Sequence, residues 1–322
     1  MEFKALWHET ATASSLRSRS WELASDQGFL LVKSLFSMIS MGTERLVASG
    51  NVPENMYESM RVPYQQGSLA LPVNYGYSMV GEVMSEGHDL LGKKVHLLHP
   101  HQNYCWVRKD DLFQVPDEVS AERAALASNM ETVVNAIWDS GLSVGDRVLI
   151  AGLGSLGALL MLSLTQMPGI EIFVLEKDPQ RKDWAVKQGV KTVEDAYDGY
   201  FDIAFHTTGN EQALQICLDS LAFEGKLIEL SWYGNRAISL HLGATFHQQR
   251  KQIISSQVGS IPSARSGRWD FKRRKQVVFE LLKNPLYDQL PKEIWAFAQT
   301  PILFEKIRQN PQSLPIINLI AY

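Results

Sequence analysis

The segment 147–157, Arg-Val-Leu-Ile-Ala-Gly-Leu-Gly-Ser-Leu-Gly, constrains the fold of this chain more than any other. A polar turn at Gly145 and Asp146 precedes a short apolar run, three glycines follow as G-x-G-x-x-G, and an apolar stretch of helical length, 158–164, comes next. This order of strand, glycine turn and helix is the context in which the spacing binds a dinucleotide. The glycines allow a tight turn, close approach of a pyrophosphate and close packing of the helix, whose N-terminus offers free N–H groups to phosphate. The segment therefore predicts a nucleotide-binding βαβ unit.

A second apolar run, 170–175, ends at Glu176. A carboxylate there accepts hydrogen bonds from the adenosine ribose hydroxyls and repels a 2′-phosphate, which favours NAD(H) over NADP(H). Lys177 and Arg181 lie close by in the sequence, and because either could accommodate the phosphate, NADP(H) stays open. Strand-end residues further along are expected to face the cofactor as well. The predicted cofactor-binding residues are Gly152, Leu153, Gly154, Ser155, Leu156, Gly157, Glu176, Lys177, Arg181, Thr207, Thr208 and Ser231.

Length and composition favour a two-domain soluble protein. The chain has 322 residues, of which 45% are hydrophobic and 20% charged, and a chain of this length exceeds one average core. A net charge of −4 gives no reason to expect nucleic acid or an acidic membrane as partner. Neither an 18-residue apolar run nor a signal-peptide pattern is present, and the two cysteines cannot form a disulfide framework. We expect a cytoplasmic protein with a small-molecule substrate.

The texture of the sequence changes near residue 120. Before it, short β segments such as 29–34, 79–84 and 94–98 are separated by glycines and prolines, as in a compact β barrel or sandwich. After it, strands and helices alternate, which predicts parallel βαβ units. The last residues lack this rhythm and are expected to fold back onto the β-rich part. The predicted fold class is α/β. The predicted division is a β-rich domain, 1–127, a doubly wound domain, 128–260, and a return to the first domain, 261–322.

At these motifs the chain resembles the medium-chain dehydrogenases/reductases, the alcohol dehydrogenase superfamily. The resemblance covers nearly the whole length and rests on Phe-Leu-Leu-Val-Lys with the following 39–44, on Gly-Tyr-Ser-Met-Val-Gly-Glu-Val at 76–83, and on the nucleotide motif. It implies a GroES-like substrate domain, a Rossmann domain, a cleft between them and hydride transfer with a nicotinamide cofactor. It also implies a homodimer, paired through the strand near 256–260. Five stretches look closer to a subgroup named for bacteriochlorophyllide dehydrogenase and threonine dehydrogenase-like proteins: 41–44, 99–102, 129–132, 229–234 and 256–259.

The chain departs from this family at the positions of its catalytic zinc ligands. Zinc members hold the metal with cysteine, histidine, and cysteine or glutamate, and the matching residues here are Ser40, Tyr77 and Ser128. Zinc prefers thiolate, imidazole or carboxylate ligands, and the four-cysteine lobe of many members is missing too. The departure predicts a zinc-independent member without a bound metal.

Three residues are candidates for polarising or protonating a carbonyl substrate. Thr43 matches the hydroxyl that relays the substrate proton in the family, although a loop threonine can equally satisfy backbone groups. Tyr77 stands where a metal ligand would point, so its phenol either donates to a substrate oxygen or fills the vacated space. His99 matches a position that lines the substrate pocket in the family, and a histidine there can act as general acid near neutral pH or have a plain structural role.

Three functions are compatible with these features. The leading hypothesis is a zinc-independent NAD(P)-dependent oxidoreductase acting on an alcohol or ketone. A reductase of activated C=C bonds, such as a quinone or enone reductase, uses the same fold and needs chiefly hydride positioning. A nucleotide-sensing protein that has lost catalysis is the third.

Overall fold

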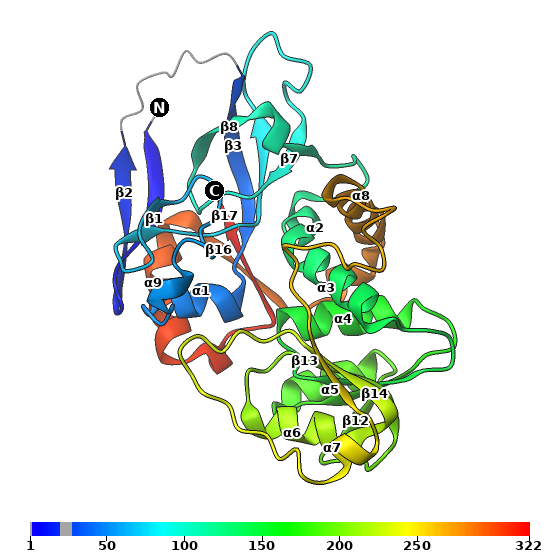
Figure 1. Cartoon of the computed structure of the whole chain (residues 1–322). Helices are drawn as coiled ribbons and strands as arrows, with labels where there is room; N and C mark the ends of the chain where they lie inside the picture. The colour runs from blue at the N-terminus through cyan, green and yellow to red at the C-terminus, as the bar shows by residue number, and fades with distance from the viewer. Residues whose placement is uncertain (1, 20–27) are drawn as a thin grey trace. The chain divides into compact units, whose positions relative to one another are not determined.

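The computed structural model describes residues 2–19 and 28–322, and the chain divides into two compact units (Figure 1). Unit 1 comprises Met1–Ser128 and Leu282–Tyr322, and unit 2 comprises Asn129–Leu281. The first boundary lies one residue from the predicted one, whereas the second lies at 281/282 and not at 260/261. The difference has a physical reason: α8 (Phe271–Leu282) is tied to α3 (Ala127–Ser140) by ion pairs of Arg274 and Lys275 with the buried Glu131.

Unit 1 is built from two β-sheets that are antiparallel except for the parallel pair β16–β17. The larger sheet has the order β16-β17-β3-β6-β7-β9, with β8 also paired to β3, and the smaller has the order β2-β1-β5-β4. Its strands are β1 (Phe3–Thr10), β2 (Ala13–Arg19), β3 (Phe29–Met38), β4 (Gln66–Gly67), β5 (Val73–Asn74), β6 (Met79–Val83), β7 (Lys94–Leu97), β8 (Tyr104–Arg108), β9 (Phe113–Gln114), β16 (Lys292–Ala296) and β17 (Ile317–Ala321).

The C-terminal segment completes unit 1. β17 pairs antiparallel with β3, with Leu319 opposite Met38, and β16 runs parallel to β17; in Figure 1 the red β17 lies beside the blue β3. Helix α9 (Thr300–Gln309) contacts β2 and α1 (Met41–Ala48). The sequence did not predict α1. It forms because Glu44, in its first turn, accepts the Ser40 N–H at 2.8 Å and so satisfies a donor at the helix start.

Unit 2 is a doubly wound α/β domain. Its six strands are all parallel, in the order β12-β11-β10-β13-β14-β15, so the chain winds outward on both sides of β10. The strands are β10 (Arg147–Ala151), β11 (Glu171–Leu175), β12 (Lys191–Val193), β13 (Phe201–His206), β14 (Leu221–Glu229) and β15 (Gln252–Ser255). Between them run α4 (Ser155–Thr165), α5 (Pro179–Lys187), α6 (Glu211–Ser220) and α7 (Thr245–Gln248). The β segment expected to reach residue 260 ends at Ser255.

Short helices complete the described chain: α2 (Ala121–Ala124), and the 3₁₀ turns Glu54–Met56, Lys109–Asp111, Pro285–Gln289, Phe297–Gln299 and Pro311–Ser313. Ser120 is the N-cap of α2, since its side chain accepts the Arg123 N–H. Across residues 2–19 and 28–322, no helix is both long and apolar enough to cross a membrane.

Candidate nucleotide-binding and substrate-binding sites

The glycine turn of unit 2 forms a backbone cradle between β10 and α4. Gly152 has φ +92°, a left-handed conformation that favours glycine. A Cβ on Gly157 would lie 1.9 Å from the Gly152 carbonyl oxygen, so only glycine lets α4 pack this closely on the loop. A Cβ on Gly154, in contrast, would meet no atom within 4 Å. Gly154 therefore borders open space, where a pyrophosphate can approach the backbone and the N-terminus of α4.

Glu176, just past β11, shapes the same loop. Its Oε2 accepts the Leu153 N–H at 2.7 Å, and its Oε1 accepts the N–H groups of Lys177 (2.7 Å) and Asp178 (3.0 Å). Both oxygens thus accept backbone N–H groups, and Oε2, which accepts only one, keeps a lone pair for a further donor such as a ribose hydroxyl. The structure places this carboxylate beside the glycine turn.

The other residues predicted to bind the cofactor occupy different environments. Leu153 is fully buried and takes part through its backbone N–H alone. Ser155 begins α4 and is near Asn129, whose Nδ2 lies 3.4 Å from the Ser155 Oγ. Leu156 is half-buried in the first turn of α4, and Lys177 is exposed. Arg181 lies in the first turn of α5, with its Nε 4.0 Å from Asp178.

Thr207, Thr208 and Ser231 lie in the loops that follow β13 and β14. The Thr207 hydroxyl donates to the carbonyl oxygens of Ala151 (2.9 Å) and Gly152 (3.2 Å), which ties its loop to the glycine turn. The Ser231 Oγ accepts the Gly209 N–H at 2.9 Å. The structure therefore brings these three residues to the same sheet edge as the glycine turn.

Sequence reasoning missed a buried pair beneath these loops. His206 ends β13, Glu229 ends β14, and the two are opposite each other in the parallel register. The His206 Nδ1 lies 2.9 Å from the Glu229 Oε2. The signal was available, because both are polar residues that close apolar strand runs, and such positions share one edge of a parallel sheet.

A cluster of hydroxyl groups marks the second candidate site, in unit 1. The Tyr77 phenol lies near the side chains of Ser40 and Thr43, and both hydroxyls act on its pKa. Burial, and after it the Glu44 carboxylate, raise the pKa of Tyr77 to about 12, although the two hydroxyls act in the opposite direction. The phenol is thus a hydrogen-bond donor at every pH near neutrality. Thr43 and Tyr77 are half-buried, so part of each faces outward.

The residues at the family's metal-ligand positions do not fit a zinc ion. Ser128 Oγ donates to the Tyr77 carbonyl oxygen at 2.8 Å, and the Ser40 side chain lies near the Tyr77 phenol. All three are neutral hydroxyl groups, whereas zinc is held by thiolate, imidazole or carboxylate. Within residues 2–19 and 28–322, no three His, Cys, Asp or Glu side chains are grouped as metal ligands would be.

Glu44 and His101 form a buried pair beside the hydroxyl cluster. The Glu44 Oε2 lies 2.8 Å from the His101 Nε2, and neither side chain has any exposed surface. The other ring nitrogen, Nδ1, lies 2.8 Å from Ser37 Oγ, which in turn lies 2.8 Å from the Tyr322 hydroxyl. Arg45, the next residue in the chain, is exposed, and the partner of Glu44 is the buried His101 imidazole.

Of the two roles that the sequence left open for His99, general acid or structural residue, its environment favours the structural one. It is buried, its Nδ1 lies 2.8 Å from the Pro100 carbonyl oxygen, and its ring stacks on Tyr64 with centroids 5.2 Å apart. Burial lowers the pKa of His99 to about 4. The imidazole is therefore neutral at physiological pH, donates its Nδ1–H to the backbone, and has no proton to give to a substrate.

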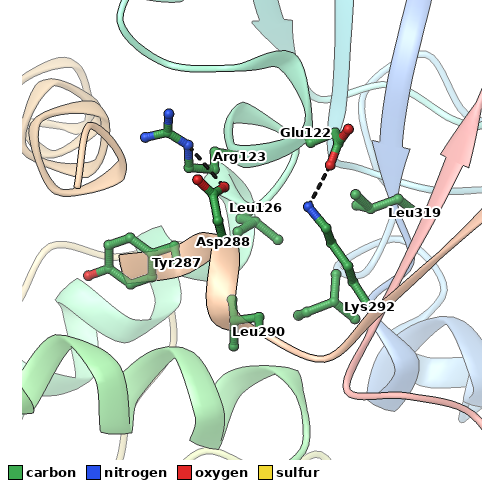
Figure 2. A pocket seen from close by; sticks show the side chains of 9 residues that line it. Glu122, Arg123, Leu126, Tyr287, Asp288, Leu290, Lys292 and Leu319 are labelled. Atoms are coloured by element: carbon green, nitrogen blue, oxygen red, sulfur yellow. Dashed lines mark hydrogen bonds and ion pairs between the residues drawn. The ribbon is translucent and has the colours of Figure 1, made fainter. Parts of the chain in front are cut away.

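A small hollow in unit 1 lies among α2, the turn 285–289 and the β16–β17 pair (Figure 2). Two ion pairs border it, Arg123 with Asp288 (3.2 Å) and Glu122 with Lys292 (2.6 Å). Its volume of about 10 Å³ admits no more than a water molecule. This hollow is therefore not a substrate pocket.

The sequence is similar to those of several curated dehydrogenases over half of the chain or more. No protein-family model matches the sequence. (R,R)-butanediol dehydrogenase of Bacillus subtilis is 24% identical over 212 residues, 52% of this chain and 61% of that enzyme. D-guloside 3-dehydrogenase of Escherichia coli K12 is 25% identical over 221 residues, 62% of each. The chain thus spans under two thirds of the length of these curated relatives.

Solved structures extend the likeness to the whole fold. A putative zinc-binding dehydrogenase from Sinorhizobium meliloti, solved with NADP, superposes with a TM-score of 0.78 at 16% identity, covering 100% of both chains. An alcohol dehydrogenase from E. coli CFT073, solved with NADH, gives 0.76 at 13% identity, covering 100% of this chain and 99% of that one.

These comparisons show that the chain is similar in sequence to butanediol and guloside dehydrogenases. Its two units share the GroES-like and Rossmann folds of the solved dehydrogenases. Relatives of both cofactor types are known, one solved with NADP and one with NADH. The subgroup suggested by the short motifs stays a prediction.

Proposed function

We propose that this protein is a zinc-independent, NAD(P)-dependent oxidoreductase that transfers hydride between the nicotinamide and a carbonyl or alcohol carbon. One observation supports this most: at the positions that the family resemblance matches to zinc ligands, the chain has the neutral hydroxyl side chains of Ser40, Tyr77 and Ser128. Members with zinc use the metal as a Lewis acid on the substrate oxygen. Hydroxyl donors fixed in place can stabilise the same developing charge.

The backbone cradle of unit 2 fits a dinucleotide. Gly154 borders open space, α4 presents its N-terminus there, and Glu176 lies beside the turn with one lone pair of Oε2 left for a ribose hydroxyl. The bound nicotinamide supplies or accepts the hydride. The chain's residues bind its phosphates through backbone N–H groups and orient its ribose through Glu176, Thr208 and the loops beside them. A carboxylate at this place supports NAD(H) as the preferred cofactor.

Tyr77 is the proposed proton donor in unit 1. With its pKa at about 12 the phenol stays protonated, and the hydroxyls of Ser40 and Thr43 lie near it. A protonated phenol suits reduction, where the new alkoxide or enolate must receive a proton. Glu44 and His101 lie behind the cluster, and Glu44 anchors the Ser40 N–H, so this pair is assigned to positioning.

A second candidate function is reduction of an activated C=C bond. The donor set favours it specifically, because an enolate oxygen needs a weak proton donor and not a Lewis acid, and Tyr77 is a weak acid. Quinones and enones are the matching substrate class. A catalytically silent nucleotide sensor would keep the cradle of unit 2 and be indifferent to the loss of Tyr77.

The edge of the unit 2 sheet is the basis for a proposal on quaternary structure. β15 ends the parallel sheet of unit 2 in the strand order, and Ile253 on it is 40% exposed. We propose that the protein forms a homodimer through this edge, as the family resemblance implies; sedimentation at micromolar concentration tests it, and a monomer would contradict it.

Turnover of a Tyr77→Phe variant tests the proposed function. Purified protein is given NADH or NADPH with a panel of ketones, enones and quinones, and nicotinamide absorbance is followed. Loss of one such donor is expected to lower kcat about 10²- to 10³-fold with little change in the Kd for NADH. Tyr75→Phe is the matched control, because that buried hydroxyl reaches only the Met60 carbonyl oxygen, 3.5 Å away. Equal rates in the two variants would remove Tyr77 from the mechanism.

A further inference from the structure

Three loops meet at the carboxyl edge of the unit 2 sheet, and one buried pair connects two of them. His206 and Glu229 close the neighbouring strands β13 and β14, and His206 has no exposed surface. Glu229 also accepts the Ser231 N–H at 2.6 Å and the Tyr233 hydroxyl at 2.8 Å. Burial raises the pKa of Glu229, but its hydrogen bonds, first of all that with His206, outweigh burial and lower the pKa overall. An ionised carboxylate therefore faces His206 Nδ1.

The other nitrogen of His206 faces the nucleotide loops. Its Nε2 lies 2.6 Å from the Thr208 Oγ1, and this oxygen also accepts the Asn210 N–H at 3.0 Å. Thr208 is exposed and borders the glycine turn, since a Cβ on Gly152 would lie 2.6 Å from the Thr208 Cγ2. The Thr208 hydroxyl is thus the polar group that joins the buried pair to the turn.

The Thr208 hydroxyl has a single proton, and His206 decides where it points. A neutral His206 donates Nδ1–H to Glu229, and its Nε2 lone pair then accepts the Thr208 O–H. A protonated His206 donates from both nitrogens, so Thr208 accepts at Oγ1 and its own O–H is released toward solvent. Only the second state offers a donor to an oxygen atom of a bound nucleotide.

We propose that His206 and Glu229 are positioning residues that turn the Thr208 hydroxyl toward a ribose or phosphate oxygen of the nucleotide, so that nucleotide binding is coupled to protonation of His206. This rests on the nucleotide binding proposed above. The groups that face His206 are Glu229, Tyr233 and Ser231 after β14. Cys217 of α6 interacts with Glu229, and Arg236 stacks over Tyr233 and donates to the Gly209 carbonyl oxygen at 2.5 Å. Burial raises the pKa values of Tyr233 and Cys217, so neither of them titrates in the neutral range.

The test measures the Kd for NADH between pH 5.5 and 9 by ligand fluorescence. The wild-type Kd is expected to be lower at the acid end, by about 10-fold or more, the usual effect of one hydrogen bond to a charged or strongly polar acceptor. Thr208→Val removes the released donor, so its Kd should stay near the wild-type alkaline value across the range. Thr208→Ser should restore the pH dependence. Thr165→Val, in the same unit, is the matched control.

A second variant separates positioning from simple structural support. Glu229→Gln keeps an acceptor for Nδ1–H but removes the negative charge that stabilises a protonated His206. In Glu229→Gln the midpoint of the pH dependence of the Kd for NADH is therefore expected to move to lower pH. An NMR titration of the His206 ring should show the same shift. Parallel pH profiles in wild type, Thr208→Val and Glu229→Gln would overturn the inference while leaving nucleotide binding intact. A wild-type protein that binds neither NADH nor NADPH at any pH would overturn the proposed function and this inference together.

Discussion

The two candidate sites are built from different materials. In unit 2 the site consists mostly of backbone: the Gly152 turn, the start of α4 and a close approach at Gly157 that no side chain could share. In unit 1 the site consists of side chains, the hydroxyls of Ser40, Thr43 and Tyr77 with the Glu44–His101 pair behind them. A site made of backbone requires glycine at fixed positions, so its sequence pattern is recognisable. A site made of side chains can change its chemistry when a few residues are replaced, while the fold stays the same.

The largest expected effect breaks the backbone site. Gly157→Ala would place a methyl group 1.9 Å from the Gly152 carbonyl oxygen. Because backbone atoms cannot yield as a flexible side chain can, we expect a loss of roughly 3 kcal/mol or more in the free energy of unfolding and no measurable NADH binding. Urea unfolding followed by circular dichroism, and an NADH titration, measure both.

Gly154→Ala separates folding from binding in the same turn. Its Cβ meets nothing within 4 Å and its φ of −71° suits alanine, so stability should be unchanged. The Kd for NADH is expected to rise about 100-fold, which is roughly 2.7 kcal/mol, because the methyl group occupies the space of the pyrophosphate. Gly243→Ala, at another open position, is the control. Unchanged NADH affinity in Gly154→Ala would show that the nucleotide does not bind at this turn.

Glu44→Gln tests the buried pair of the side-chain site. The substitution leaves His101 facing an uncharged group without exposure to water. Weakening a buried hydrogen bond of this kind costs about 1–3 kcal/mol, which urea unfolding at pH 7 should report. Glu58→Gln, at an exposed position, should change little. A stability equal to wild type would show that the pair carries no structural role.

The next effect concerns pH. Burial lowers the pKa of His99 from 6.5 to about 4, so the folded state binds its proton less well than the unfolded state does. The associated stability is present above pH 6.5 and is lost as pH falls through 4, and the difference between these values corresponds to roughly 3 kcal/mol. His99→Gln should reduce the acid loss of stability over this interval. His241→Gln, at an exposed position, is the control, and equal slopes in both variants would contradict the assignment.

The smallest effect sharpens the choice of cofactor. Glu176→Gln keeps the acceptor for the Leu153 N–H but removes the charge that repels a 2′-phosphate. The ratio of the Kd values for NADPH and NADH should fall about 10-fold, roughly 1.4 kcal/mol. Titration of wild type and variant with both nucleotides measures it. A ratio near one already in the wild type would show that Glu176 does not select NAD(H).

The sequence predicted most of the fold. Repeated apolar strands, glycine turns and caps such as Ser120 are local signals, so the strand and helix order of unit 2 could be read directly. Helix α1 was missed because its start is satisfied by a side chain of its own first turn, Glu44, in a region rich in glycine and proline. The second boundary was misplaced because the ion pairs of Arg274 and Lys275 with Glu131 join distant segments.

Less of the sites could be predicted. The glycine turn and Glu176 follow from spacing, because backbone conformation and strand ends have sequence signatures. The pairs Glu44–His101 and His206–Glu229 depend on which segments are neighbours in the folded protein. No local sequence pattern predicts that. The residue type of His99 allows an acid role, and the burial that removes that role is a tertiary property.

The central claim is that hydride transfer in this protein needs no zinc, and one preparation tests it most directly. The protein is dialysed against a chelator, its zinc content is measured by mass spectrometry of the metal, and its NADH-dependent reduction of carbonyl and enone substrates is assayed at once. We predict turnover with less than stoichiometric zinc and no gain when zinc is added back. Zinc bound at one ion per chain, with activity lost on its removal and restored by its return, would contradict the account.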